Sequence, residues 1–137
     1  MTLPKGSRSV SALGFSSDGK YIAAADMSDD HSVHLFDLSK QDKKGKCLHL
    51  GFVKKDRKKV FQIMWSPTVP GSFVSVGLEH IFFWKVSPKL LATKASPMPT
   101  AKAGTKLGFP SVAFSRSGNA YIASSNGTVY GFTSSGG

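Results

Sequence analysis

The sequence has almost no cysteine, few acidic residues and no long apolar run. Cys47 is the only cysteine, which excludes an intrachain disulfide and a cysteine-based zinc site and indicates a reducing, intracellular compartment. No segment approaches the roughly 20 apolar residues that span a membrane, and residues 1–15 lack the apolar core of a signal peptide. We therefore expect a cytoplasmic or cytoskeletal protein with no membrane contact.

Basic residues greatly outnumber acidic ones. The chain holds 18 Lys and Arg against 8 Asp and Glu, which gives a net charge of +10. This charge favours attraction to polyanions, whether nucleic acid, anionic lipid or acidic protein, and does not choose among them. The apolar content of 40% is typical of a globular chain, and 137 residues are enough to bury roughly two-thirds of the unfolded surface.

One pattern occurs three times along the chain. A short apolar strand ends in an aromatic residue followed by Ser at Phe15-Ser16, Trp65-Ser66 and Phe114-Ser115. Each pair precedes a turn that contains Gly or Pro, a strand of small and β-branched residues, a second turn, and a third strand that ends on an aromatic. Fourth, outer strands are expected at KCLHLGFV and KLLAT. A repeat of about 50 residues built from short strands predicts an internally repeated all-β fold.

Repeats of this kind predict the blades of a β-propeller, which are four-stranded antiparallel sheets stacked face to face. We expect a partial propeller over residues 1–137, with blade one at 9–53 and blade two at 59–95. An inter-blade loop at 96–107 would lead to blade three at 108–137, which lacks its outer strand. About three blades cannot close a ring, so the remaining blades of a longer protein or a second copy are expected to cover the apolar end faces.

The segment VGLEHIFFWKV places four large apolar residues in succession. A strand that is buried on both faces accommodates such a run, because successive side chains point to opposite faces. We expect Phe82 and Trp84 on one face, and Ile81 and Phe83 on the other. The aromatic residues assigned to the blade core, rather than to a ligand site, are Phe15, Phe36, Trp65, Phe82, Phe83, Trp84 and Phe114.

Carboxylates and imidazoles concentrate in one stretch, at Asp26, Asp29, Asp30, His31, His34 and Asp37. A metal site is one interpretation, but a tight turn in which Asp side chains bond backbone amides is preferred. His31 and His80 are expected at equivalent turn positions of two blades. The residues assigned to structural turns are Asp29, His31, His80 and Gly127. The sequence shows no nucleophile elbow, phosphate-binding loop or zinc spacing, so we expect no enzyme and no cofactor.

Half of the positive charge falls within residues 39–59. The candidate partner-binding patch consists of Lys43, Lys44, Lys46, Lys54, Lys55, Arg57, Lys58 and Lys59. These residues flank the outer strand of blade one and are expected on its rim and the adjoining face. They form either a solvated edge that discourages strand pairing or an electrostatic site for an acidic partner. Exposed aromatics interleaved with basic residues, the usual sign of RNA binding, are missing, so nucleic acid is a less favoured partner.

The third-strand endings LFDL and FFWKV resemble the Trp-Asp ending of WD repeats, although Lys85 and Thr133 replace the acid in two of the three repeats. In order, the three repeats also resemble consecutive blades of the echinoderm microtubule-associated protein (EMAP) family. The matching residues are Asp26, Ser28, Asp29, Asp30 and His31, then Gly77, His80, Ile81, Phe83 and Trp84, then Val112, Ala113, Phe114, Gly118, Ser125 and Gly127.

This resemblance implies a non-catalytic WD-repeat scaffold that associates with tubulin or microtubules, in the cytoskeleton or in a cilium or flagellum. The acidic tails of tubulin would suit a Lys-rich surface. The alternative is a generic WD-repeat adaptor that binds another protein and never contacts tubulin.

Overall fold

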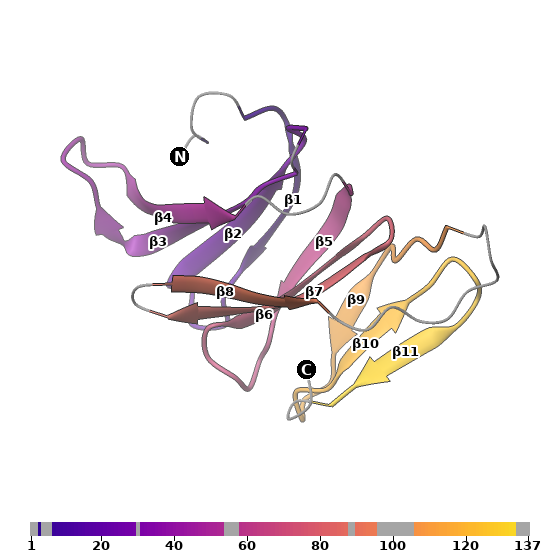
Figure 1. The fold of residues 1–137 in the computed structure, drawn as a ribbon. Helices are drawn as coiled ribbons and strands as arrows, with labels where there is room; N and C mark the ends of the chain where they lie inside the picture. Colours follow the sequence, from indigo (N-terminus) through magenta and orange to yellow (C-terminus); the bar gives the residue numbers. More distant parts are fainter. Residues whose placement is uncertain are drawn as a thin grey trace.

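The structure is a computed structural model that describes residues 3, 7–29, 31–53, 58–87, 90–95 and 106–133. Its regular elements are all β-strands, grouped in three antiparallel sheets that follow one another in chain order (Figure 1). The predicted all-β fold of stacked antiparallel blades is therefore confirmed. Within the described ranges, no helix is long and apolar enough to cross a membrane.

The first sheet has the strand order β1-β2-β3-β4, and each strand pairs with the next along the chain. The strands are β1 (Val10–Phe15), β2 (Tyr21–Asp26), β3 (Val33–Gln41) and β4 (Cys47–Val53). The small side chains of β2 are buried on both faces of the sheet. Gly19, with φ of 71°, occupies the left-handed position of the β1–β2 turn, which residues with a Cβ rarely adopt.

The second sheet repeats this plan with the order β5-β6-β7-β8. The strands are β5 (Val60–Trp65), β6 (Ser72–Gly77), β7 (His80–Ser87) and β8 (Leu90–Ala95). Trp65 pairs with Phe73, and Phe73 in turn pairs with Trp84, as Phe15, Ile22 and Phe36 do in the first sheet. The two sheets are thus structural equivalents, residue by residue, along their inner three strands.

The third sheet contains three described strands in the order β11-β10-β9. They are β9 (Val112–Phe114), β10 (Ala120–Ala123) and β11 (Val129–Phe132). Residues 106–110 lead into this sheet and bond to the second one, because Glu79 N donates to Leu107 O and Phe109 N donates to Gly77 O. Most of the expected inter-blade loop and the last four residues of blade three lie outside the described residues.

Two apolar cores lie between consecutive sheets. The first contains Trp65, Phe73 and Trp84, packed against the small and branched residues of β2 and β3. The second contains Ile81, Leu107, Phe109, Val112 and Ile122. Phe82 packs against the first core and Phe83 against the second, so the four consecutive apolar residues of β7 alternate between two buried faces. Phe114 is half-buried beside the second core.

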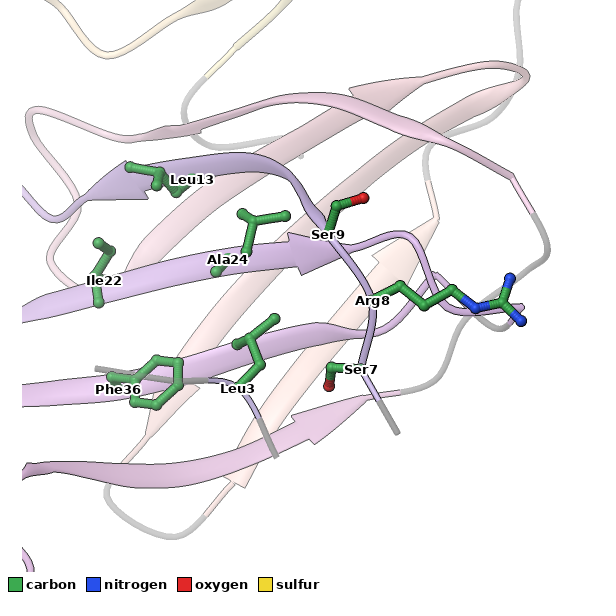
Figure 2. A pocket seen from close by; sticks show the side chains of 9 residues that line it. Leu3, Ser7, Arg8, Ser9, Leu13, Ile22, Ala24 and Phe36 are labelled. Atoms are coloured by element: carbon green, nitrogen blue, oxygen red, sulfur yellow. The ribbon is translucent and has the colours of Figure 1, made fainter. Parts of the chain in front are cut away.

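The outer face of the first sheet has no sheet packed against it in the described chain. The prediction that Phe15 belongs to a buried core is wrong here, because 61% of this residue is exposed, as is 54% of Leu13. Phe36 lies on the same face but is only 2% exposed. Leu3 lies beside it and helps to line a pocket of about 440 Å³ over this face (Figure 2).

Candidate protein-interaction surface

The strand directions place the turns of all three sheets at two opposite ends. One end, here called the basic end, carries the turns at residues 16–20, 42–46, 66–71 and 115–119. The sheets are in contact there. The Tyr21 ring stacks on the Trp65 ring with centroids 6.2 Å apart, and a Cβ on Gly118 would lie 2.0 Å from Thr68 Oγ1. The opposite end carries the turns at 27–32, 78–79 and 124–128.

The basic end holds most of the exposed positive charge of the described residues. Its exposed cationic side chains are Lys20, Lys40, Lys43, Lys44, Lys46, Lys85 and Arg116. Against these seven cations stand three carboxylates, those of Asp18, Asp37 and Asp42. The cations come from all three sheets, so the charge extends across the sheets and is not confined to one turn.

The carboxylates of the basic end accept hydrogen bonds from their own turns and strands. Asp18 accepts from Ser16 Oγ at 2.6 Å and from Lys20 N at 2.9 Å. Asp42 accepts from the backbone amides of Lys44 and Lys46, at 2.8 and 3.0 Å. These hydrogen bonds hold the pKa of each carboxyl below its ordinary value, so both remain ionised at neutral pH.

Asp37, near the end of β3, behaves in the same way. It accepts from Ser39 Oγ at 2.6 Å and from Ser39 N at 2.9 Å, and these bonds lower its pKa in spite of its burial. Among the described residues, none of the seven cations of the basic end forms an ion pair with a carboxylate. The Lys20 Nζ instead lies 5.1 Å from the centre of the Tyr21 ring. The cations at this end are therefore open to an external anion.

Among the side chains that the structure describes, those at the opposite end are closer to neutral in net charge. The Arg8 guanidinium lies 3.1 Å from the Asp29 carboxylate, and Lys58 forms an ion pair with Glu79. Lys59 and Lys106 are the other cations at this end whose side chains the structure describes, and both are exposed. The third described carboxylate at this end, that of Asp26, is buried within the first sheet.

The structure divides the basic patch expected from the sequence. Lys43, Lys44 and Lys46 lie at the basic end, whereas Lys58 and Lys59 lie at the opposite end. The seven residues of β4 separate the two groups by roughly 20 Å, at about 3.3 Å per residue. The remaining members, Lys54, Lys55 and Arg57, lie outside the described residues.

The structure also adds cations that sequence reasoning missed. Lys20, Lys40, Lys85 and Arg116 are far apart in the sequence and share one end of the molecule. Each lies in a turn or close to a strand end, and alternating strand direction was the signal that could have grouped them.

The turn histidines do not occupy equivalent positions, so that expectation is wrong. His31 has a positive φ of 44°, and its counterpart in the second sheet is Glu79, with φ of 47°. His80 instead begins β7, where its Nε2 lies 2.7 Å from Ser75 Oγ. The indole Nε1 of Trp84 donates to the same hydroxyl at 2.8 Å. His80 therefore satisfies a buried polar group of the second sheet.

Two other residues assigned to turns lie where a turn role requires. Asp29 is exposed in the β2–β3 turn and pairs with Arg8. Gly127 has φ of 84° in the β10–β11 turn, the left-handed conformation that favours glycine.

The cluster of acids and imidazoles forms a hydrogen-bonded network on the outer face of the first sheet. Asp26 Oδ1 accepts from Ser28 N at 3.0 Å and Ser32 N at 3.2 Å, which fixes the β2–β3 turn. His34 Nε2 donates to Asp26 Oδ2 at 3.0 Å, and His34 Nδ1 lies 3.2 Å from His49 Nε2. A neutral His34 that donates to Asp26 can accept from His49.

The pKa values of this network follow from its burial and its hydrogen bonds. Burial raises the pKa of Asp26, but hydrogen bonds from Ser28 and His34 outweigh it, so the net shift is downward. Burial, and then the neighbouring His34, lower the pKa of His49. The described residues include no group of three or more side chains arranged to hold a metal ion. The arrangement is suited to holding a turn.

Comparison with known proteins agrees with this architecture. Residues 1–37 match the family model for the WD domain, G-beta repeat. The ciliary WD repeat-containing protein ctxp80 of Euplotoides octocarinatus is 26% identical over 132 residues, which cover 93% of this chain and 17% of that protein. Echinoderm microtubule-associated protein-like 4 of Xenopus laevis is 32% identical over 89 residues, which cover 64% of this chain and 9% of that protein.

Among solved structures, the β-propeller domain of Cps50 (Swd1) from Myceliophteria thermophila superimposes with a TM-score of 0.65. The match covers 92% of this chain and 39% of that one, at 16% identity, and so shows the fold alone. The chain thus has a β-propeller fold, and its residues 1–37 match a WD repeat. It spans less than a fifth of the length of either curated relative.

Proposed function

We propose that this chain is part of a non-catalytic WD-repeat scaffold that associates with tubulin or microtubules, in the cytoskeleton or in a cilium. A WD-repeat propeller supports a protein-interaction scaffold, and such propellers generally bind other proteins. The observation that carries the finer proposal is the net charge of +10, together with seven exposed cations at one end of the described sheets that form no ion pair with a described carboxylate. The names of the two relatives, one ciliary and one microtubule-associated, support the same direction.

An acidic protein suits this surface better than RNA does. Recognition of single-stranded RNA relies on exposed aromatic rings on which bases stack. At the basic end, the Tyr21 ring stacks on Trp65 and lies beneath the Lys20 ammonium. Trp65, Phe73 and Trp84 are buried in the first core. A generic adaptor for another acidic protein is the alternative that the same charge favours.

The proposal includes a partner for the outer sheet faces. Leu13 and Phe15 on β1 and Tyr121 and Val129 in the third sheet are exposed by 46% to 65%. Apolar area of this kind is normally covered. We propose that the remaining blades of a longer chain, or a second copy of this one, cover these faces.

Co-sedimentation with microtubules tests the tubulin proposal. The chain is expected to pellet with microtubules at low ionic strength, and less so near 0.15 M salt, where charges more than about 8 Å apart are screened. Removal of the acidic tubulin tails by limited proteolysis should reduce pelleting. RNA added at the same ionic strength should compete only weakly with microtubules for the chain. Absence of pelleting at low salt would refute microtubule association. Pelleting that changes neither with ionic strength nor with removal of the tubulin tails would refute the electrostatic basis of that association.

A further inference from the structure

We infer that the partner-binding surface is the basic end of the three sheets and that its ligand is an extended, carboxylate-rich polypeptide segment. The inference deepens the proposed function and rests on it only in so far as tubulin would supply such a segment. It differs from the sequence-based patch because it includes cations of all three sheets and omits Lys58 and Lys59.

The two ends differ in charge among the side chains that the structure describes. The basic end has seven exposed cations against three carboxylates, and all three carboxylates accept hydrogen bonds from neighbouring backbone or serine groups. Asp18 and Asp42 accept hydrogen bonds from amides within their own turns, and the lysines beside them form no ion pair with a carboxylate of the described residues. Among the side chains that the structure describes, the opposite end has four cations, and two of these, Arg8 and Lys58, already pair with carboxylates.

The cations of the basic end are distributed over all three sheets. Lys43, Lys44 and Lys46 occupy the outer hairpin of the first sheet, Lys85 lies near the end of β7, and Arg116 lies in the first turn of the third sheet. A small anion would meet one or two of these side chains. An extended polypeptide advances about 3.3 Å per residue and can place successive carboxylates along a row that crosses several sheets.

The aromatic rings near the basic end favour a polypeptide ligand over a nucleic acid. The two exposed rings near this end, Phe15 and Tyr121, belong to the first and third sheets, and the Tyr21 ring is stacked on Trp65. Because the second sheet lies between the two exposed rings, the described residues offer no continuous row of rings on which successive bases could stack, and the basic end suits carboxylates better than bases.

Charge reversal at each end tests the inference. The two variants are Lys43→Glu/Lys44→Glu at the basic end and Lys59→Glu/Lys106→Glu at the opposite end, which change the net charge equally at exposed positions. Circular dichroism verifies that both fold. Binding of a fluorescent poly-glutamate peptide, followed by anisotropy, should weaken roughly tenfold in the first variant and at most about twofold in the second. Equal weakening in both, or greater weakening in the second, would overturn the inference.

The same variants distinguish the inference from the proposed function. If the peptide binds at the basic end but the wild-type chain does not pellet with microtubules, the inference stands and the tubulin proposal fails. If wild type pellets and the basic-end variant pellets equally well, the tubulin proposal stands and the inference fails. Tighter binding of a single-stranded RNA of equal charge than of poly-glutamate, at the same salt, would overturn the assignment of an acidic polypeptide.

Discussion

The indole Nε1 of Trp65 donates a hydrogen bond of 2.7 Å to the backbone carbonyl of Gly14, and so joins β5 of the second sheet to β1 of the first. The two strands approach so closely that a Cβ on Gly14 would lie 2.7 Å from the backbone oxygen of Ile63. The bond satisfies a carbonyl at a seam between two sheets, where a lost partner is costly. Trp65 therefore acts both as core volume and as the donor that fixes the position of one blade against the next.

The Trp65→Phe variant should lose this donor and keep an aromatic ring. We expect the free energy of unfolding to fall by about 1–3 kcal/mol, because the Gly14 carbonyl is left without its partner. Urea denaturation followed by far-UV circular dichroism measures the change. Phe61→Leu, at an exposed site on the same strand, is the control and should stay within about 0.5 kcal/mol of wild type. Equal stability of Trp65→Phe and wild type would contradict this role.

Gly77 is required by a second close approach of backbones. A Cβ at this position would lie 1.9 Å from the carbonyl oxygen of Lys59, which accepts a hydrogen bond from Leu78 N at 3.0 Å. Gly77→Ala should therefore separate the strand ends and lower the free energy of unfolding by more than about 2 kcal/mol.

Gly131→Ala is the matched control for Gly77→Ala. Its Cβ would meet only the Tyr121 side chain, at an ordinary 3.4 Å, so we expect a change within about 0.5 kcal/mol. Thermal unfolding of the two variants under one buffer gives the comparison. A Gly77→Ala melting temperature equal to that of Gly131→Ala would show that the Lys59 strand yields without cost.

Asp26 should make stability depend on acid pH. Its pKa in the folded chain is lowered, so the carboxylate stabilises the fold above the unfolded value of about 4, and this contribution is lost as the pH falls through the folded pKa. Asp26→Asn should lower stability at pH 7 by about 2 kcal/mol, because His34 and the β2–β3 turn lose their charged acceptor. It should also weaken the fall in stability below pH 5.

Asp29→Asn is the control for this pH dependence. It alters an exposed carboxylate three residues further along the same turn, and exposed ion pairs contribute less than about 1 kcal/mol. Urea midpoints measured from neutral to acid pH give both profiles. Superimposable profiles of Asp26→Asn and wild type would show that the buried carboxylate does not couple to folding.

His49 should make the free energy of unfolding depend on pH in a second interval, nearer to neutral pH. Its pKa is lowered by burial and by His34, so the fold prefers the neutral imidazole. Stability should therefore decline as the pH falls below the unfolded value of about 6.5 and level off below the folded pKa. Urea midpoints measured between about pH 8 and 5.5, a range that spans the unfolded pKa of histidine, should change less with pH in His49→Gln than in wild type. A slope unchanged by His49→Gln would assign the dependence to another group.

The sequence was sufficient to predict the stacked antiparallel sheets but not to predict which cations share one end of the molecule. The aromatic-Ser landmarks and the alternation of Ile81 through Trp84 depend on local chemistry and the two-residue period of a strand, both visible in the chain itself. The sequence run from Lys43 to Lys59 looked continuous, yet β4 carries its two parts to opposite ends. Grouping cations by surface requires the strand directions.

Two core residues were missed for a related reason. Leu107 and Phe109 are 4% and 0% exposed, although the sequence placed the first in a loop and gave no role to the second. Their burial comes from hydrogen bonds of this segment to Gly77 and Glu79 in another sheet, which no local pattern reveals. Conversely, Phe15 has the pattern of a core residue and is exposed, because the described chain supplies no sheet for that face.

The exposed face of β1 predicts self-association. A second copy that covers this face should make the apparent molar mass rise above 14.6 kDa with increasing concentration. Leu13→Lys/Phe15→Lys places two charges on the face and should return the mass to that of a monomer, because burial of unpaired ammonium groups is strongly unfavourable. Leu50→Lys, at a residue of β4 that is 42% exposed, is the control and should associate like wild type. Light scattering coupled to size-exclusion chromatography measures the molar mass of wild type and of both variants. A wild-type chain that stays monomeric at every concentration would exclude a second copy and leave further blades of a longer chain to cover this face. Association that persists in the double variant would show that the chain self-associates through another surface.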